Sequence, residues 1–197
     1  MKKTIDFWYE FASPYSYLAA MRVEDVAGAA GVDVVWRPFL LGAIYKRMEM
    51  PMLPMQLSPQ KAAYMWMDVA RQAKRYGLDF NKPVQFPQIG ILAARVALVG
   101  KQEGWCPAFS RGVYHANFVH GADISKKDVI GPILAEIGHD AEDIFERAAT
   151  QAIKDELRAE TDKAFDKGIF GVPTFFAGDQ MFWGNDRLEQ ALEAVLN

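Results

Sequence analysis

The segments of this 197-residue chain that are predicted to be β-strands lie only near its two ends. Residues 5–11 and 32–39 are rich in β-branched and aromatic side chains, and they flank a predicted helix that ends near Gly31. This order favours a parallel pair of strands joined by a right-handed crossover. Residues 174–177 and 180–183 are predicted to form a hairpin. Because the chain between the two pairs is predicted to be helical, we expect an α/β fold with an all-helical insertion.

The long middle of the chain has the patterns of several successive helices. The expected helices cover residues 61–76, 87–104, 106–120, 126–137, 140–150 and 155–167. Four methionines and three prolines fall between Met48 and Pro59, which favours a loop or lid there. We therefore expect a discontinuous, strand-containing domain formed by residues 1–45 and 155–197. Residues 46–154 are expected to form the lid loop and the helical insertion domain.

Composition and charge exclude several classes of function. Hydrophobic residues make up 51% of the chain, enough for a sizeable core, and the formal net charge is only −3. This balance favours neither a nucleic acid nor a membrane surface as a partner. No apolar run approaches the roughly 18 residues that a membrane span needs. No signal-type apolar stretch follows the N-terminal lysines, so we expect a cytoplasmic protein.

The chain itself has little capacity for sulfur or metal chemistry. Cys106 is the single cysteine, so neither an intrachain disulfide nor a Cys-x-x-Cys redox pair can form, and a structural role is favoured. His115 and His120 are five residues apart, which does not place them on one face of a helix, and His139 stands alone. We therefore expect no metal site.

The sequence Ser13-Pro14-Tyr15-Ser16 joins the first predicted strand to the first predicted helix. Serine is a preferred N-cap and proline a preferred first helical residue, so Ser13 has a purely structural explanation. The chemical alternative is that its hydroxyl, at a helix N-terminus, donates a hydrogen bond to a bound thiolate. Taken alone, this segment favours the structural explanation.

Pro173 stands just before the third predicted strand, in Gly171-Val172-Pro173-Thr174. The Val172–Pro173 bond is either trans, which is the commoner isomer, or cis. A cis bond would turn the backbone N–H and C=O groups of Val172 outward, where an extended peptide could pair with them as an added strand.

Together these motifs resemble the 2-hydroxychromene-2-carboxylate isomerase and kappa-class glutathione transferase family, a branch of the disulfide-oxidase-like thioredoxin folds. The similar segments are residues 6–19, 36–42, 75–78, 168–176 and 182–189, spread over essentially the full chain. The resemblance implies a thioredoxin-like fold in which a serine, Ser13, takes the place of the first redox cysteine. Any thiol at this site would then have to come from a ligand, and the family implies glutathione.

The resemblance also implies how glutathione would be held. Ser13 would face the glutathione sulfur, and Val172, before a cis Pro173, would pair with the backbone of the cysteinyl unit. Asn185 and Asp186 would hold the γ-glutamyl end, where an aspartate suits the ammonium group.

Lys61 matches a lysine of the family that would meet the glycine carboxylate of glutathione. Structural alternatives remain open for the polar residues of this implied site. Asn185 is otherwise a plain helix N-cap, Asp186 an acid in the first helical turn, and Lys61 a solvated helix residue.

One position departs from the pattern of the family. An asparagine that contacts the ligand usually follows the second strand, and Met50 falls at that position. The neighbouring loop methionines either line a site for a flat aromatic substrate or fill the core. For Met65 and Met67, in the next predicted helix, core or inter-subunit packing is favoured.

The resemblance implies a homodimeric, glutathione-dependent isomerase. Its reaction would interconvert 2-hydroxychromene-2-carboxylate and trans-o-hydroxybenzylidenepyruvate, in the degradation of aromatic hydrocarbons, by reversible addition of the glutathione thiolate. Lys46, Arg47 or Arg37 would receive the carboxylate of this small aromatic substrate. Two alternatives stay open: a kappa-like transferase or peroxidase that acts on other electrophiles, and a glutathione-binding module without catalysis.

Overall fold

The computed structural model describes residues 2–50 and 58–197. The strands are β1 (Thr4–Tyr9), β2 (Asp33–Pro38), β3 (Thr174–Ala177) and β4 (Gln180–Trp183). The helices are α1 (Pro14–Ala20), α2 (Val23–Ala29), α3 (Leu41–Arg47), α4 (Pro59–Tyr76), α5 (Ile91–Glu103), α6 (Cys106–Phe118), α7 (Lys127–Glu136), α8 (Ala141–Ala149), α9 (Gln151–Asp166), the 3₁₀ helix η2 (Asn185–Arg187) and α10 (Leu188–Leu196). Within the described residues, no helix combines the length and the hydrophobicity that a bilayer crossing requires.

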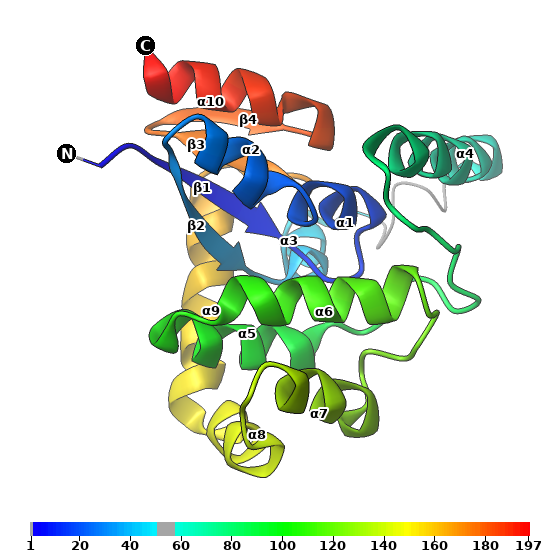
Figure 1. Cartoon of the computed structure of the whole chain (residues 1–197), viewed down its shortest axis with the longest axis vertical. Coiled ribbons are helices and arrows are strands. Elements are labelled where there is room, and N and C mark those ends of the chain that lie inside the picture. The colour runs from blue at the N-terminus through cyan, green and yellow to red at the C-terminus, as the bar shows by residue number, and fades with distance from the viewer. Residues whose placement is uncertain (1, 51–57) are drawn as a thin grey trace.

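The strands form one mixed sheet in the order β2-β1-β3-β4. β1 and β2 are parallel, as their β-α-β order predicts, whereas β3 runs antiparallel to both β1 and β4. Trp8 of β1 pairs with Thr174 at the start of β3, so the C-terminal end of the first strand meets the N-terminal end of the third. The two ends of the chain therefore build one sheet, with the inserted helices beyond it (Figure 1).

Side chains of β1 alternate between the two faces of the sheet, as strand geometry requires. Ile5, Phe7 and Tyr9 belong to the main core, which also contains side chains of α1, α5, α6 and α10. Trp8 belongs to a second core on the other face, where it packs with Phe39 and with side chains of α3 and α9. In Figure 1, α10 lies above the sheet and α5 and α6 lie below it.

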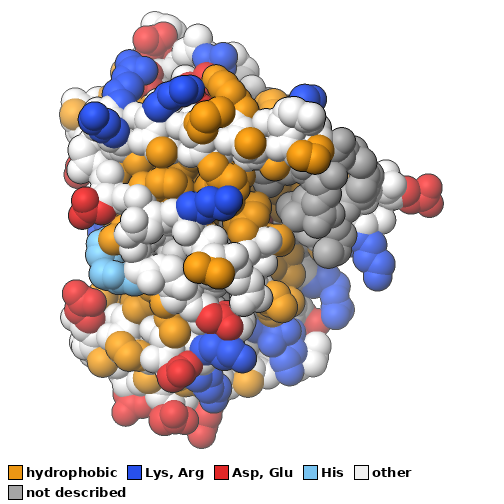
Figure 2. Space-filling view, turned by 90° about the vertical axis from the view of Figure 1, so that its right-hand side faces the viewer, with side chains coloured by type: hydrophobic (Ala, Val, Ile, Leu, Met, Phe, Trp, Pro, Cys, Tyr) orange, Lys and Arg blue, Asp and Glu red, His pale blue; other side chains and the backbone are white. Residues whose placement is uncertain are grey.

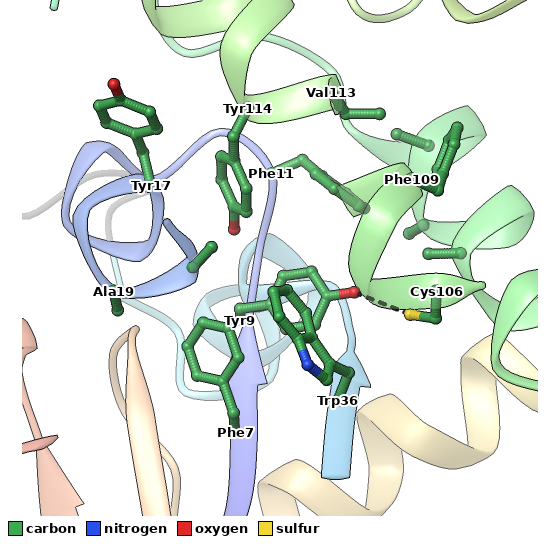
Figure 3. Packing of buried hydrophobic residues seen from close by; sticks show 14 of the residues in the cluster. Phe7, Tyr9, Phe11, Tyr17, Ala19, Trp36, Cys106, Phe109, Val113 and Tyr114 are labelled. Atoms are coloured by element: carbon green, nitrogen blue, oxygen red, sulfur yellow. Dashed lines mark hydrogen bonds between the residues drawn. The ribbon is translucent and has the colours of Figure 1, made fainter. Parts of the chain in front are cut away.

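The aromatic side chains of β1 join the sheet to the inserted helices. Phe7 stacks on Tyr9 with ring centroids 5.0 Å apart, and Trp36 meets both rings edge-on. The Tyr9 hydroxyl points toward α6, where it hydrogen-bonds Ser110 Oγ at 2.8 Å and Cys106 Sγ at 3.4 Å (Figure 3). The core is thus continuous between the sheet and the insertion, and the domain boundaries expected from the sequence stay a prediction.

Several helix boundaries differ from those expected. The segment after Ser13 is split, because a turn at residues 21–22 separates α1 from α2. The short helix α3 follows β2, where the sequence indicated none, and α5 begins at Ile91 rather than at residue 87. α9 begins at Gln151 rather than at residue 155, because the Thr150 side chain caps it by accepting a hydrogen bond from Ile153.

The packing of α5 depends on a glycine. A Cβ at Gly100 would lie 2.4 Å from Cε3 of Trp105, well inside contact distance. We predict that Gly100→Ala lowers the free energy of unfolding by about 1–3 kcal/mol, because the ring and the helix must move apart. Urea denaturation measures this change.

Gly28→Ala is the matched control for this prediction. Gly28 also lies inside a helix, but a Cβ there would meet no atom within 4 Å. This variant should gain about 0.5–1 kcal/mol, because alanine loses less conformational entropy than glycine in a helix. A Gly100→Ala protein as stable as the wild type would contradict the close packing of Trp105.

Candidate active site

The loop after β1 and the loop before β3 lie side by side, because these strands are antiparallel neighbours. Ser13 stands on the first loop and Val172 on the second, and both line the same cleft. The Val172–Pro173 peptide bond is cis, which was one of the two alternatives open from the sequence. The fold therefore brings together two motifs that lie at opposite ends of the chain.

The cleft has a volume of about 1210 Å³. A volume of this size exceeds the roughly 300–1,000 Å³ of a site for one small ligand, so a tripeptide and a small aromatic molecule could share it. Most of its lining is apolar, and the larger apolar side chains include Pro14, Leu40, Leu41, Met65, Met67, Phe86, Ile89, Ile91, Val172 and Trp183. On the face seen in Figure 2, hydrophobic side chains gather across the middle, with a basic side chain among them.

Ser13 caps α1 and also faces the cleft. Its Oγ accepts a hydrogen bond from the backbone N–H of Ser16 at 3.2 Å. This bond occupies a lone pair of the oxygen and leaves the hydroxyl proton available to a ligand. The structural and chemical explanations of Ser13 are therefore compatible. Because α1 has only seven residues, the hydroxyl is the main donor here, and the helix dipole adds little.

Glu10 is an acidic group of the cleft that the sequence analysis did not single out. Its carboxylate accepts a hydrogen bond from the backbone N–H of Ala12, and a Cβ at Gly90 would lie only 3.7 Å from its Oε1. Burial raises the pKa of Glu10 to about 7, and the hydrogen bond from Ala12 opposes this rise. Burial also raises the pKa of Tyr45 on α3 and Tyr114 on α6, and the charge of Glu10 adds to both.

Of the three basic residues considered for a substrate carboxylate, the cleft includes Lys46. Arg47, the next residue on α3, instead forms an ion pair with Asp162 of α9. Arg37 is held between acidic side chains, one of which is Glu160 at 3.4 Å. Of these three residues, Lys46 is the one that lines the cleft, which Lys61 also lines.

Asn185 and Asp186 lie in η2, next to α1. Asn185 is buried and donates a hydrogen bond from Nδ2 to the Tyr76 hydroxyl at 3.2 Å, while its Oδ1 has no partner among the described residues. Its side chain caps neither η2 nor α10, so the interpretation as a plain N-cap is wrong. Asp186 is exposed and lies on the side of η2 that faces Tyr15 of α1. Burial and a hydrogen bond to Asp68 raise the pKa of Tyr15, and the negative charge of Asp186 adds to this rise.

Lys61 lines the cleft from the first turn of α4. Its side chain is exposed, and its backbone N–H donates to the Ser58 hydroxyl that caps the helix. The structure thus places Lys61 in one cleft with Ser13 and Val172. Asn185 and Asp186 lie against α1, outside the lining of the cleft.

The methionines differ in their surroundings. Met65 is 7% exposed and lies in the core, as expected, but Met67 is 50% exposed and lines the cleft, so Met67 does not pack in the core of this chain, and its inter-subunit packing stays a prediction. Residues two apart on a helix face different directions, which explains the difference. Met50 is partly exposed, and Met52 and Met55 lie outside the described residues.

Cys106 lies away from the cleft, in the main core. Burial raises the pKa of its thiol, which disfavours the reactive thiolate form. Its contacts with Tyr9 and Ser110 fit the structural role favoured by the sequence.

The side chains of His115 and His120 meet, contrary to the argument from helical spacing. Their ring centroids are 4.8 Å apart. α6 ends at Phe118, and the backbone N–H of His120 returns to the carbonyl of His115 at 3.2 Å. Among residues 2–50 and 58–197, no group of three potential metal ligands includes this pair.

Comparisons with known proteins agree with this architecture. Residues 4–196 match the family model described as a DSBA-like thioredoxin domain. The 2-hydroxychromene-2-carboxylate isomerase of Sphingobium xenophagum is 30% identical over 195 residues, which cover 96% of each chain. Glutathione S-transferase kappa 2 of Caenorhabditis elegans is 24% identical, over 98% of this chain and 91% of its own. A solved structure of a 2-hydroxychromene-2-carboxylate isomerase, 25% identical, aligns with a TM-score of 0.88 over 98% of this chain and 94% of its own.

A mixed sheet with a cis-proline loop beside the first helix, extended by inserted helices, is a thioredoxin-like α/β fold. The chain belongs to the DSBA-like thioredoxin domain family, which confirms the fold predicted from its motifs. Its relatives include 2-hydroxychromene-2-carboxylate isomerases and kappa-class glutathione transferases, the group that the motifs resembled.

The raised pKa of Glu10 makes the stability of the protein depend on pH. The carboxyl binds its proton more tightly in the folded chain than in the unfolded chain, whose value is 4.5. The protonated carboxyl therefore contributes its full stabilisation below pH 4.5, and this contribution is lost as the pH rises through about 7. We predict that Glu10→Gln, which is uncharged and of the same size, raises the free energy of unfolding by about 2–3 kcal/mol at pH 8 and changes it little at pH 4.

Urea denaturation of both proteins at the two pH values tests this prediction. Glu193→Gln is the control, because Glu193 is an exposed glutamate of α10. An equal effect of Glu10→Gln at both pH values would show that Glu10 does not titrate as its burial implies.

Proposed function

We propose that this protein is a glutathione-dependent isomerase that interconverts 2-hydroxychromene-2-carboxylate and trans-o-hydroxybenzylidenepyruvate. The observation that carries the proposal is the cleft, in which Ser13, Val172 of the cis-proline loop and Lys46 border largely apolar walls. Relatives named for this isomerase, and others named for glutathione transferases, support the choice of substrate and cofactor.

The residues around the cleft fit glutathione. Val172 offers backbone groups to an extended peptide, and Lys61 offers a cation to a terminal carboxylate. The buried Oδ1 of Asn185 has no partner among the described residues and would accept a hydrogen bond from the γ-glutamyl ammonium group. Asp186 next to it supplies the opposite charge. Because Cys106 is buried in the core, a thiol in this cleft must come from the ligand.

The chain would contribute by holding the sulfur as an anion and by orienting the substrate. Glutathione would supply a thiolate whose addition turns a conjugated carbon–carbon double bond into a single bond that can rotate, and whose loss restores the double bond. Ser13 donates its hydroxyl proton to the sulfur in a hydrogen bond that favours the anion. A free thiol has a pKa of about 8.5, and one hydrogen bond to a charged group is worth about 1.5–3 kcal/mol, or roughly one to two pKa units. Lys46 holds the substrate carboxylate, and the apolar walls exclude water from the reacting bond.

A kappa-like transferase or peroxidase is the second candidate function. It is favoured by the similarity to kappa-class transferases over nearly the full chain. Such an enzyme would use the same Ser13 and cis-proline loop, with an electrophile other than a chromene carboxylate against the apolar walls.

Removal of the Ser13 hydroxyl tests the sulfur site. We predict that Ser13→Ala raises the pKa of the bound glutathione thiol by about one unit and lowers turnover about tenfold at pH 7, because one donor to the sulfur is lost. Ultraviolet absorption of the thiolate measures the pKa. Ser13→Ala also removes a helix cap, so stability should fall by about 1 kcal/mol.

Thr150→Ala separates these two effects. Thr150 caps α9, and its Oγ1 accepts the backbone N–H of Ile153 at 3.4 Å. This variant should lose similar stability and leave the thiol pKa unchanged. The proposed role of Ser13 fails if Ser13→Ala leaves that pKa unchanged as well.

A substitution at Lys46 tests the choice of substrate. We predict that Lys46→Met raises KM for 2-hydroxychromene-2-carboxylate about tenfold or more, because a charge-assisted hydrogen bond to the carboxylate is lost. Affinity for glutathione, measured by calorimetry, should be unchanged. Arg47→Met is the control, because Arg47 is paired with Asp162.

A chlorinated nitrobenzene has no carboxylate, and its conjugation should be insensitive to Lys46. If the wild type conjugates this compound faster than it isomerises the chromene carboxylate, the transferase replaces the isomerase as the favoured function.

A further inference from the structure

Glu10 has no task in the mechanism above, although it lines the same cleft as Ser13. The chain turns tightly between these residues, and the backbone N–H of Ser13 donates to the carbonyl of Glu10 at 3.1 Å. The N–H of Ala12 donates to the carboxylate itself. Glu10 is therefore fixed on a short loop beside Ser13, and a Cβ at Gly90 would lie 3.7 Å from its Oε1.

No described residue forms an ion pair with Glu10. The titratable groups that face it are Tyr45 from α3 and Tyr114 from α6, and the charged groups that share its cleft are Lys46 from α3 and Lys61 from α4. Burial raises the pKa of Glu10 to about 7. At neutral pH this carboxyl therefore both accepts and releases a proton readily, which is what a general acid–base catalyst requires.

The proposed substrate needs proton transfers that a thiolate does not perform. A 2-hydroxychromene is a cyclic hemiketal: C2 carries a hydroxyl group and the ring oxygen. The double bond cannot rotate while the ring is closed. Opening the ring requires removal of the proton of the C2 hydroxyl and delivery of a proton to the departing phenolic oxygen.

We propose that Glu10 is the acid–base catalyst that opens and closes this ring. The Glu10 carboxylate takes the proton of the C2 hydroxyl, the C2=O double bond forms, and the bond between C2 and the ring oxygen breaks with its electron pair on the oxygen. Protonated Glu10 then gives the proton to the phenolate, which returns Glu10 to its starting form. The inference rests on the proposed function, because it assumes a chromene carboxylate as the substrate.

Ring opening can be measured without glutathione. Exchange NMR follows the interconversion of the ring form and the open cis form in the presence of glutathione-free protein. The wild type should accelerate this exchange on the order of 100-fold relative to Glu10→Gln, the lower end of the range for general acid–base catalysis. Glu10→Asp, which keeps a carboxylate on a shorter side chain, should retain part of the acceleration, and Tyr45→Phe should retain it almost fully.

A substrate that cannot close its ring gives the second measurement. In cis-o-methoxybenzylidenepyruvate, a methyl group replaces the phenolic proton, so only the thiol-dependent rotation remains. Wild type and Glu10→Gln should isomerise this compound with glutathione at similar rates, whereas Glu10→Gln should be about 100-fold slower on the chromene. Equal losses on both compounds, unchanged ring exchange in Glu10→Gln, or a loss of glutathione affinity in that variant would each overturn the assignment.

These measurements separate the inference from the proposed function. If the wild type opens the ring through Glu10 but does not isomerise either compound with glutathione, the proposed function fails and the role of Glu10 stands. If the wild type isomerises both compounds and Glu10→Gln does so equally well, the proposed function stands and the role of Glu10 fails.

Discussion

The site depends on the antiparallel pairing of β1 with β3. This pairing places the Glu10–Ser13 loop beside the cis-proline loop, although the two are separated by most of the chain. Its register is fixed from both faces of the sheet, because Phe7 and Phe175 pack in one core and Trp8 and Phe176 in the other. A slip of one residue would exchange the two faces, so burial of both sets holds the two loops together.

The residues that this pairing brings into the cleft determine its chemistry. Ser13 contributes a hydroxyl group and no thiol, and the hydroxyl proton is available to a ligand. The apolar walls come from α4, from the segment before α5 and from Trp183, so elements far apart in the sequence shape the substrate side. Glu10, Lys46 and Lys61 are the charged residues that line this largely apolar cleft, and we assign Glu10 and Lys46 to the substrate and Lys61 to glutathione.

The sequence predicted the elements whose signals are local. β3 and β4 have the expected bounds, α8 lies within the expected residues 140–150 with Asp140 as its cap, and the Ser13 and Pro173 motifs lie in one cleft. Where the sequence analysis was wrong, tertiary contacts decided. The Asn185 side chain bonds Tyr76 instead of capping a helix. Glu10 went unnoticed because it falls inside the predicted strand of residues 5–11, and its burial depends on helices more than thirty residues away.

The proposed site places glutathione in this cleft with its sulfur at Ser13, and a crystal structure of the protein with glutathione tests this placement. We predict the glutathione sulfur within hydrogen-bond distance of Ser13 Oγ, with the cysteinyl backbone paired to Val172. A glutathione molecule bound elsewhere, or one in this cleft with its sulfur directed away from Ser13, would show that Ser13 does not serve the sulfur.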